Sequence, residues 1–150
     1  MIDDNNSKLN EASIPSRVLY TMVRVSDLEL SIEFYKNILG MKELRRESFT
    51  EGRFTLVFIG YGDESTNAVI ELTYNWDKDS YQHGTGYGHV ALAVNDIYAA
   101  VQRMKSLGVN VVREPGPMTH AVDETGEREV IAFIKDPDGY SIELIEHKNV

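Results

Sequence analysis

The chain contains no cysteine among its 150 residues, which excludes disulfides and thiolate metal sites. No apolar run approaches the roughly 18 residues of a membrane span, so we expect no membrane partner. Positive charge is also scarce, because 15 Lys and Arg stand against 24 Asp and Glu, for a formal net charge of −9. A nucleic-acid binder needs excess cations to release counterions, so we expect no nucleic-acid partner. An anionic small molecule needs only one or two local cations and is compatible with this composition.

The N-terminal segment, MIDDNNSKLNEASIPS, has no apolar centre and is therefore not a secretory signal. We expect residues 1–16 to form a polar, disordered leader and residues 17–148 to form one domain. A hydrophobic fraction of 42% is enough for a sizeable core. These features predict a cytoplasmic globular protein.

The first half of the domain has the pattern of one strand, one helix and three further strands. Ser26 or Asp27 can cap the helix, whose apolar residues recur at helical spacing until Gly40 ends it. The expected strands are 17–25, 41–48, 53–62 and 68–75, and the expected helix is 28–39.

The second half repeats this order. Asn95-Asp96 precedes a helical pattern that ends at Gly108, and the turn 137–139 contains a glycine that can adopt positive φ. The expected strands are 88–94, 110–116, 128–136 and 140–148, and the expected helix is 97–107. The sequence therefore predicts an α+β fold of tandem βαβββ modules, at about 17–75 and 86–148. A unit of about 70 residues is too small to bury its own sheet and needs a partner copy.

In each half two strands carry a polar residue among apolar ones, Tyr20 and Glu71 in the first half and His89 and Glu143 in the second. The repeat makes Tyr20 equivalent to His89 and Glu71 equivalent to Glu143. Each glutamate lies between Ile and Leu, where an unpaired buried carboxylate would be costly. Modules related by a pseudo-twofold axis would bring all four side chains to one concave face. One imidazole, two carboxylates and a phenol make a divalent-metal site of nitrogen and oxygen ligands.

Each of these residues taken alone also has a simpler interpretation. Alternation along a strand turns every second side chain outward, so either glutamate could face water, and a single histidine more often has a structural hydrogen bond. Their equivalence in the repeat favours the metal site. His83, His120 and His147 lack repeat partners and are expected to be surface or loop residues.

Four segments resemble glyoxalase I (lactoylglutathione lyase) of the compact bacterial type, in the vicinal oxygen chelate superfamily. They are YTMVRVSDLELSIEFYKNILGMK, AVIELTYNW, YGHVALAV and FIKDPDGYSIELIE, and the resemblance runs from about Arg17 to Lys148. It implies the glyoxalase fold and a homodimer with its sites at the subunit interface. In such dimers one chain provides the first-half ligands and the other chain the second-half ligands.

The resemblance also assigns metal ligands. Glu71, His89 and Glu143 fall on ligand positions, and Tyr20 falls on the first ligand position, which is usually His in bacterial forms and Gln in some others. A phenol ionises only near about pH 10, so this substitution puts the strength of metal binding in question. The resemblance implies a divalent metal, with nickel or cobalt favoured and zinc as the alternative.

The implied reaction is methylglyoxal detoxification, by isomerisation of the methylglyoxal–glutathione hemithioacetal to S-lactoylglutathione. Glu143 is expected to be the catalytic base, and Glu71 a ligand that can also carry the proton. Arg24 and Asn75 fall on positions that hold glutathione, whose carboxylates a guanidinium can bind bidentately. Thr119 replaces a frequent Lys, and the loop 120–129 is longer and more charged than in the compact form.

Three alternatives stay open at this point. The first is another metalloenzyme of the superfamily, such as an extradiol-type dioxygenase or a thiol transferase; the missing first-strand His counts against a dioxygenase. The second is a small-molecule-binding protein on the same scaffold, although such proteins lack the two carboxylates. The third is a paralogue with weakened or lost activity, which Tyr20 keeps open.

Overall fold

The computed structural model describes residues 10–148, so residues 1–9 and 149–150 lie outside the described part. The predicted leader, residues 1–16, falls largely in the first of these segments and stays a prediction. Its described end contains one turn of 3-10 helix, η2 (Glu11–Ser13), in which the Asn10 side chain accepts a hydrogen bond from the Ala12 N–H. Among the described residues no helix is long and apolar enough to cross a bilayer.

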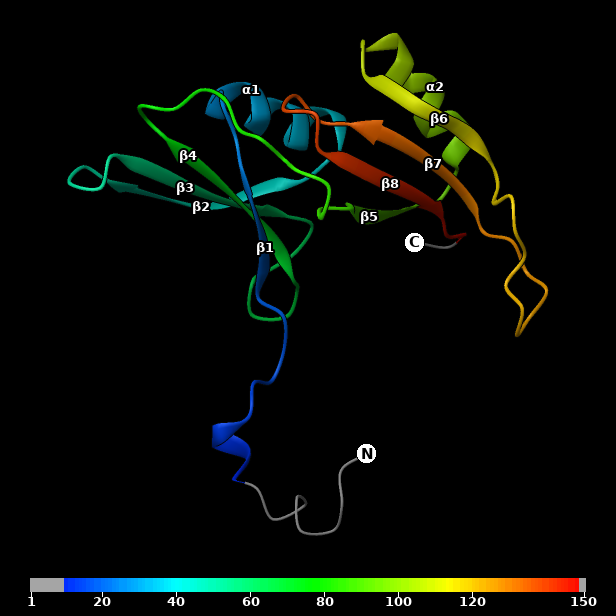
Figure 1. The fold of residues 1–150 in the computed structure, drawn as a ribbon, viewed down its shortest axis with the longest axis horizontal. Helices are drawn as coiled ribbons and strands as arrows, with labels where there is room; N and C mark the ends of the chain where they lie inside the picture. The colour runs from blue at the N-terminus through cyan, green and yellow to red at the C-terminus, as the bar shows by residue number, and fades with distance from the viewer. Residues whose placement is uncertain (1–9, 149–150) are drawn as a thin grey trace.

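Two modules with the same element order follow one another along the chain (Figure 1). The first contains β1 (Tyr20–Arg24), α1 (Leu28–Glu33), the π-helical segment η3 (Phe34–Ile38), β2 (Lys42–Phe49), β3 (Phe54–Gly60) and β4 (Val69–Asn75). The second contains β5 (His89–Val94), α2 (Ile97–Ser106), β6 (Asn110–Pro117), β7 (Val130–Lys135) and β8 (Ser141–Glu146). The predicted tandem βαβββ fold is confirmed.

Each module forms its own four-stranded sheet, in the order β1-β4-β3-β2 or β5-β8-β7-β6. The first and last strands of each module pair in parallel, and the other pairs are antiparallel. Strands β1 and β5 therefore lie at sheet edges. The matching order of the two sheets is the structural form of the sequence repeat.

Alternation along β4 separates the core face of the first sheet from its opposite face. Ile70 and Leu72 belong to the hydrophobic core together with Ile32 of α1. Since successive strand residues point to opposite faces, Glu71 and Thr73 project away from the helix. The same holds in β8, where Ile142 and Leu144 belong to the core, so the two glutamates occupy equivalent faces.

Helix ends follow the local sequence signals. The Asp27 carboxylate accepts a 3.1 Å hydrogen bond from the Leu30 N–H, and the Asp96 carboxylate accepts a 3.0 Å bond from the Ala99 N–H. Of the two predicted caps for the first helix, the structure uses Asp27. Gly139 has φ of 88° in the predicted turn after β7, which a side chain would strain.

Hydrogen bonds from the loop between β7 and β8 hold the two modules together. The Tyr35 hydroxyl donates a buried 2.8 Å hydrogen bond to the Asp136 carboxylate, and the Ser26 N–H donates a 3.0 Å bond to Asp138. Burial raises the pKa of Asp136, with hydrogen bonds from Tyr35 and backbone N–H groups opposing the shift. Burial also raises the pKa of Tyr35. These polar contacts fix the second module against α1 and η3.

Candidate active site

One face of the β1–β4 pair carries four of the six predicted site residues. Since alternate residues share a face, Tyr20 and Arg24 of β1 lie on the same side as their in-register partners Val69 and Thr73 of β4. Glu71 and Asn75 share that side. The same surface therefore carries both predicted groups. The predicted metal ligands are Tyr20 and Glu71, and next to them lie the predicted glutathione-binding residues, Arg24 and Asn75.

Glu71 is a buried carboxylate, 7% exposed. The Thr73 hydroxyl donates a 2.7 Å hydrogen bond to its Oε2 atom. Among the described residues no buried side-chain polar atom is left without a hydrogen-bond partner, so the cost of burying this carboxylate is offset locally. The surface reading of Glu71 does not apply to this chain.

Tyr20 and His89 occupy matching environments. The Tyr20 ring meets Phe58 edge-on, with centroids 5.2 Å apart and planes at 75°, and the His89 ring meets Phe133 with values of 5.2 Å and 77°. In both sheets the phenylalanine is the in-register neighbour of the glutamate. Tyr20 therefore stands in the place that the repeat gives to an imidazole.

His89 and Glu143 form the second donor pair. The His89 Nε2 atom lies 3.1 Å from Glu143 Oε1, and the side chains are 40% and 14% exposed. The two predicted ligand atoms therefore lie side by side. Tyr20, 42% exposed, and His89 are thus accessible donors beside more enclosed carboxylates.

The two donor pairs do not meet within one chain. In residues 10–148 no three His, Asp or Glu side chains are grouped closely enough to hold a metal ion. The expectation that the repeat brings all four residues to one face is therefore not met inside a single chain. Each module carries one of the two predicted donor pairs.

A polar pocket of about 740 Å³ extends from Arg24 and Asn75 and is completed by four residues after β4, namely Lys78, Ser80, Tyr81 and Gln82. The Asn75 amide donates a 3.0 Å hydrogen bond to the Tyr81 hydroxyl, and Lys78 Nζ lies 4.9 Å from the centroid of the Tyr81 ring. Within the described part of the chain, neither Arg24 nor Lys78 forms a salt bridge. Two cations without carboxylate partners make this pocket suitable for an anion.

Sequence reasoning missed Lys78 and Tyr81, which lie in the connection between the modules. The available signal was their position directly after the strand that carries Asn75.

The connection between the modules also contains His83, a half-buried loop residue. Its ring stacks on Tyr140 with centroids 4.0 Å apart, and the Tyr140 hydroxyl donates a 2.8 Å hydrogen bond to the Arg24 carbonyl. The second module thus supports the backbone of Arg24.

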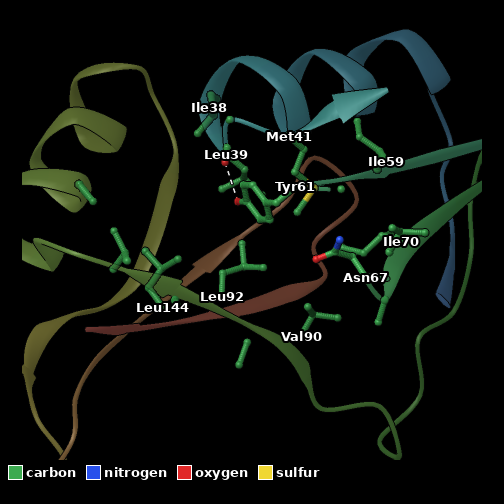
Figure 2. A pocket seen from close by; sticks show the side chains of 18 of the residues that line it. Ile38, Leu39, Met41, Ile59, Tyr61, Asn67, Ile70, Val90, Leu92 and Leu144 are labelled. Carbon is green, nitrogen blue, oxygen red and sulfur yellow. Dashed lines mark hydrogen bonds between the residues drawn. The ribbon is translucent and has the colours of Figure 1, made fainter. Parts of the chain in front are cut away.

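A larger cavity of about 930 Å³ lies between the modules and is mostly apolar, with residues from η3, β3, β4 and β5 around it (Figure 2). Figure 2 shows Tyr61 directed into it, with its hydroxyl donating a 2.6 Å bond to the Leu39 carbonyl. None of the six predicted site residues lines this cavity. It is therefore separate from the donor pairs.

The loop between β6 and β7 leaves the second sheet as a long projection (Figure 1). Backbone hydrogen bonds from Met118 to Glu129 and from Val122 to Glu127 tie its two arms together. His120 is exposed, and Thr119 is exposed as well. The predicted surface or loop position of His120 agrees with this.

Comparison with known proteins identifies the family to which this fold belongs. Residues 17–144 match the model of the Glyoxalase/Bleomycin resistance protein/Dioxygenase superfamily. The chain is 55% identical over 133 residues to a lactoylglutathione lyase of Neisseria meningitidis, covering 89% of this chain and 92% of that protein. The chain belongs to the glyoxalase I family. It is also 51% identical to a lactoylglutathione lyase of Escherichia coli O157:H7, covering 89% and 94% of the two chains.

Solved structures of glyoxalase I have the same fold as this chain. Glyoxalase I from Zea mays aligns with a TM-score of 0.81 at 42% identity, covering 89% of this chain and 46% of the maize chain. The chain thus spans less than half the length of that relative. The trypanothione-dependent glyoxalase I of Leishmania major aligns with a TM-score of 0.74 at 44% identity, covering 88% and 87%. The predicted family, fold and lactoylglutathione lyase activity are confirmed, and the family implies a divalent metal and a glutathione-derived substrate.

Proposed function

We propose that this chain is one protomer of a homodimeric lactoylglutathione lyase whose metal sites form between two chains. One chain would provide Tyr20 and Glu71, and the other would provide His89 and Glu143. The observation that carries this proposal is the presence of two matching donor pairs on separate sheets, with no three such donors grouped in residues 10–148.

The length of the maize relative supports a site built from two units. The match covers 46% of that chain, which leaves room there for a second unit of similar size. In a dimer with twofold symmetry the same surface is used by both copies. Pairing the first module of one chain with the second module of the other then gives two identical sites.

The donors fit a divalent first-row metal. One imidazole nitrogen, two carboxylates and one phenol oxygen form a mixed nitrogen and oxygen set, and His89 Nε2 and Glu143 Oε1 are already 3.1 Å apart. We propose nickel or cobalt, with zinc as the alternative. When bound, the metal supplies a Lewis acid that stabilises negative charge on the two neighbouring substrate oxygens.

The reaction is a proton transfer between adjacent carbons. The Glu143 carboxylate removes the proton from the carbon that bears sulfur and hydroxyl, and returns it to the neighbouring ketone-derived carbon. The hydroxyl proton of the first carbon moves to the ketone oxygen, so that the first carbon becomes the thioester carbonyl and the second carbon bears the hydroxyl, and no oxidant is required. Glu71, buried and hydrogen-bonded by Thr73, holds its position as a ligand, and His89 is a ligand without a proton-transfer role.

The pocket at Arg24 and Asn75 holds the glutathione part of the substrate. Arg24 can bind a carboxylate through two parallel N–H groups, and Lys78 adds a second positive charge beside it. The Asn75 side chain, already paired with Tyr81, contributes a neutral polar contact. The location of the protein in the cytoplasm stays a prediction from the sequence.

Protein purified without chelators should contain about one divalent metal per chain, and should convert methylglyoxal and glutathione to a thioester that absorbs in the ultraviolet. The assay is run on metal-free protein reloaded separately with nickel, cobalt and zinc. Turnover with at least one metal is expected. Failure with all three, in protein that binds metal and elutes as a dimer, would rule out this activity.

A further inference from the structure

The sequence repeat is broken two residues after each glutamate. Thr73 follows Glu71 in β4, while Ile145 follows Glu143 at the equivalent position in β8. Residues two apart on a strand share a face, so each of these side chains lies beside its glutamate. One glutamate has a hydroxyl neighbour and the other has a hydrocarbon neighbour.

The structure shows what the hydroxyl does. Thr73 is 8% exposed, and its Oγ1 atom donates a 2.7 Å hydrogen bond to Glu71 Oε2. A hydrogen bond to an ionised carboxylate is shorter and stronger than one between neutral groups. Because both residues belong to β4, this contact exists in each chain before any partner or metal binds.

Glu143 has no such anchor. In the described part of the chain its polar side-chain contact is the one with His89, at 3.1 Å, and Ile145 has no donor to offer. The terminal torsion of a glutamate side chain has a broad, shallow preference. Without a fixed donor, the Glu143 carboxylate can rotate between its neighbours.

We propose that Thr73 is a positioning residue that fixes Glu71 as a permanent ligand, and that the Thr73–Ile145 difference leaves Glu143 free to carry the proton. This inference rests on the proposed function. It explains how two glutamates at equivalent places in a repeat take different roles. The difference lies in one hydroxyl group rather than in the carboxylates themselves.

The first test compares two substitutions at Thr73. Thr73→Val keeps the side-chain shape and removes the donor, whereas Thr73→Ser keeps the donor. Groups that orient a metal ligand typically contribute roughly 10–100-fold to metal affinity, so we expect Thr73→Val to weaken nickel or zinc binding by about that factor in titration calorimetry. Thr73→Ser should bind like the wild type. Circular dichroism and thermal melting check that both variants are folded. Equal metal affinities of the two folded variants would overturn the proposal.

The second test installs the hydroxyl in the other module. Ile145→Thr and Ile145→Val have the same side-chain shape and differ only in the donor. Restraining the base should reduce kcat by roughly tenfold or more in Ile145→Thr, with KM unchanged, while Ile145→Val stays near the wild type. Equal kcat values for the two variants would contradict the role assigned to Ile145.

The two tests separate this inference from the proposed function. Metal affinity is measured without substrate, so the Thr73 comparison reads the positioning of Glu71 even if the wild type fails to isomerise the hemithioacetal. An inactive wild type that binds metal would refute the function. A metal-binding, active wild type in which Thr73→Val behaves like Thr73→Ser would refute the inference alone.

Discussion

His89 Nε2 lies 3.1 Å from Glu143 Oε1, across the parallel pair β5 and β8. The two residues come from the first and last strands of the second module, which the fold pairs side by side. The first module places Tyr20 and Glu71 on the corresponding parallel pair, β1 and β4. A donor pair is therefore a product of the βαβββ topology, and two modules yield two pairs.

Replacing Glu143 by Gln should abolish isomerisation without unfolding the protein. The amide keeps the size of the side chain but cannot accept the proton, and general acid–base groups contribute about 10²–10⁴-fold. We expect kcat to fall by roughly that range in the thioester assay. Glu51→Gln, at an exposed turn, is the control and should keep full activity. Retained turnover in Glu143→Gln would exclude this residue as the base.

Replacing Tyr20 by His should strengthen metal binding. An imidazole nitrogen is a stronger ligand for these metals than a phenol oxygen, so the histidine variant should bind at least roughly tenfold more tightly. Titration calorimetry with nickel and zinc measures the change. Tyr20→Phe keeps the ring against Phe58 and removes the oxygen, so it reports how much the phenol contributes. A His variant that binds metal no better than the Phe variant would remove position 20 from the ligand set.

The two cations of the proposed glutathione pocket, Arg24 and Lys78, should act on substrate binding rather than on turnover. Lys78→Gln and Arg24→Lys each remove charge or bidentate geometry from the pocket. Losing a charge-assisted hydrogen bond costs about 1.5–3 kcal/mol, so KM should rise by roughly tenfold or more while kcat changes little. Lys42→Gln, an exposed position on β2, is the matched control. An unchanged KM in both variants would place the thiol elsewhere.

The buried Asp136 should make stability fall with rising pH. Burial raises its pKa above the ordinary value of 3.8, so the folded state binds more protons than the unfolded state in the range above 3.8, and the free energy of unfolding decreases as pH rises there. The nearby Asp138 adds negative charge that acts in the same direction. Asp136→Asn removes this titration.

Thermal melting of both proteins across that range checks the sign. The melting temperature of the wild type, relative to Asp136→Asn, should fall as the pH increases from about 4 toward neutrality. The amide can still pair with the Tyr35 hydroxyl, which donates to the carboxylate in the wild type. A difference that stays constant or grows in favour of the wild type would contradict the raised pKa.

Local patterns were sufficient to predict most elements of this fold, although the expected helix 28–39 is α-helical only over Leu28–Glu33 and π-helical over Phe34–Ile38. Helical spacing of apolar residues, cap residues such as Asp27 and Asp96, and the turn at Gly139 each act over a few positions, and the structure uses all of them. The repeat itself indicated that Glu71 and Glu143 are equivalent. Their equivalence was confirmed as strand register against Phe58 and Phe133.

Contacts between distant segments were beyond the sequence pattern. The Tyr35–Asp136 bond joins residues 101 positions apart, and no local signal links them. Thr73 and Glu71 are only two residues apart, but predicting their hydrogen bond requires knowing that Glu71 is buried. Lys78 and Tyr81 lie in a connection without periodic pattern, where only three-dimensional placement reveals a shared pocket.

The central claim is that each metal site combines the first module of one chain with the second module of another. Chains carrying Glu71→Gln and chains carrying Glu143→Gln, each inactive alone, can be co-expressed with different affinity tags. Random pairing makes about half of the dimers mixed, each with one intact and one doubly substituted site, so activity should return to about a quarter of the wild-type value per chain. Purified mixed dimers that remain inactive would show that both glutamates must lie in the same chain, and would contradict the shared site.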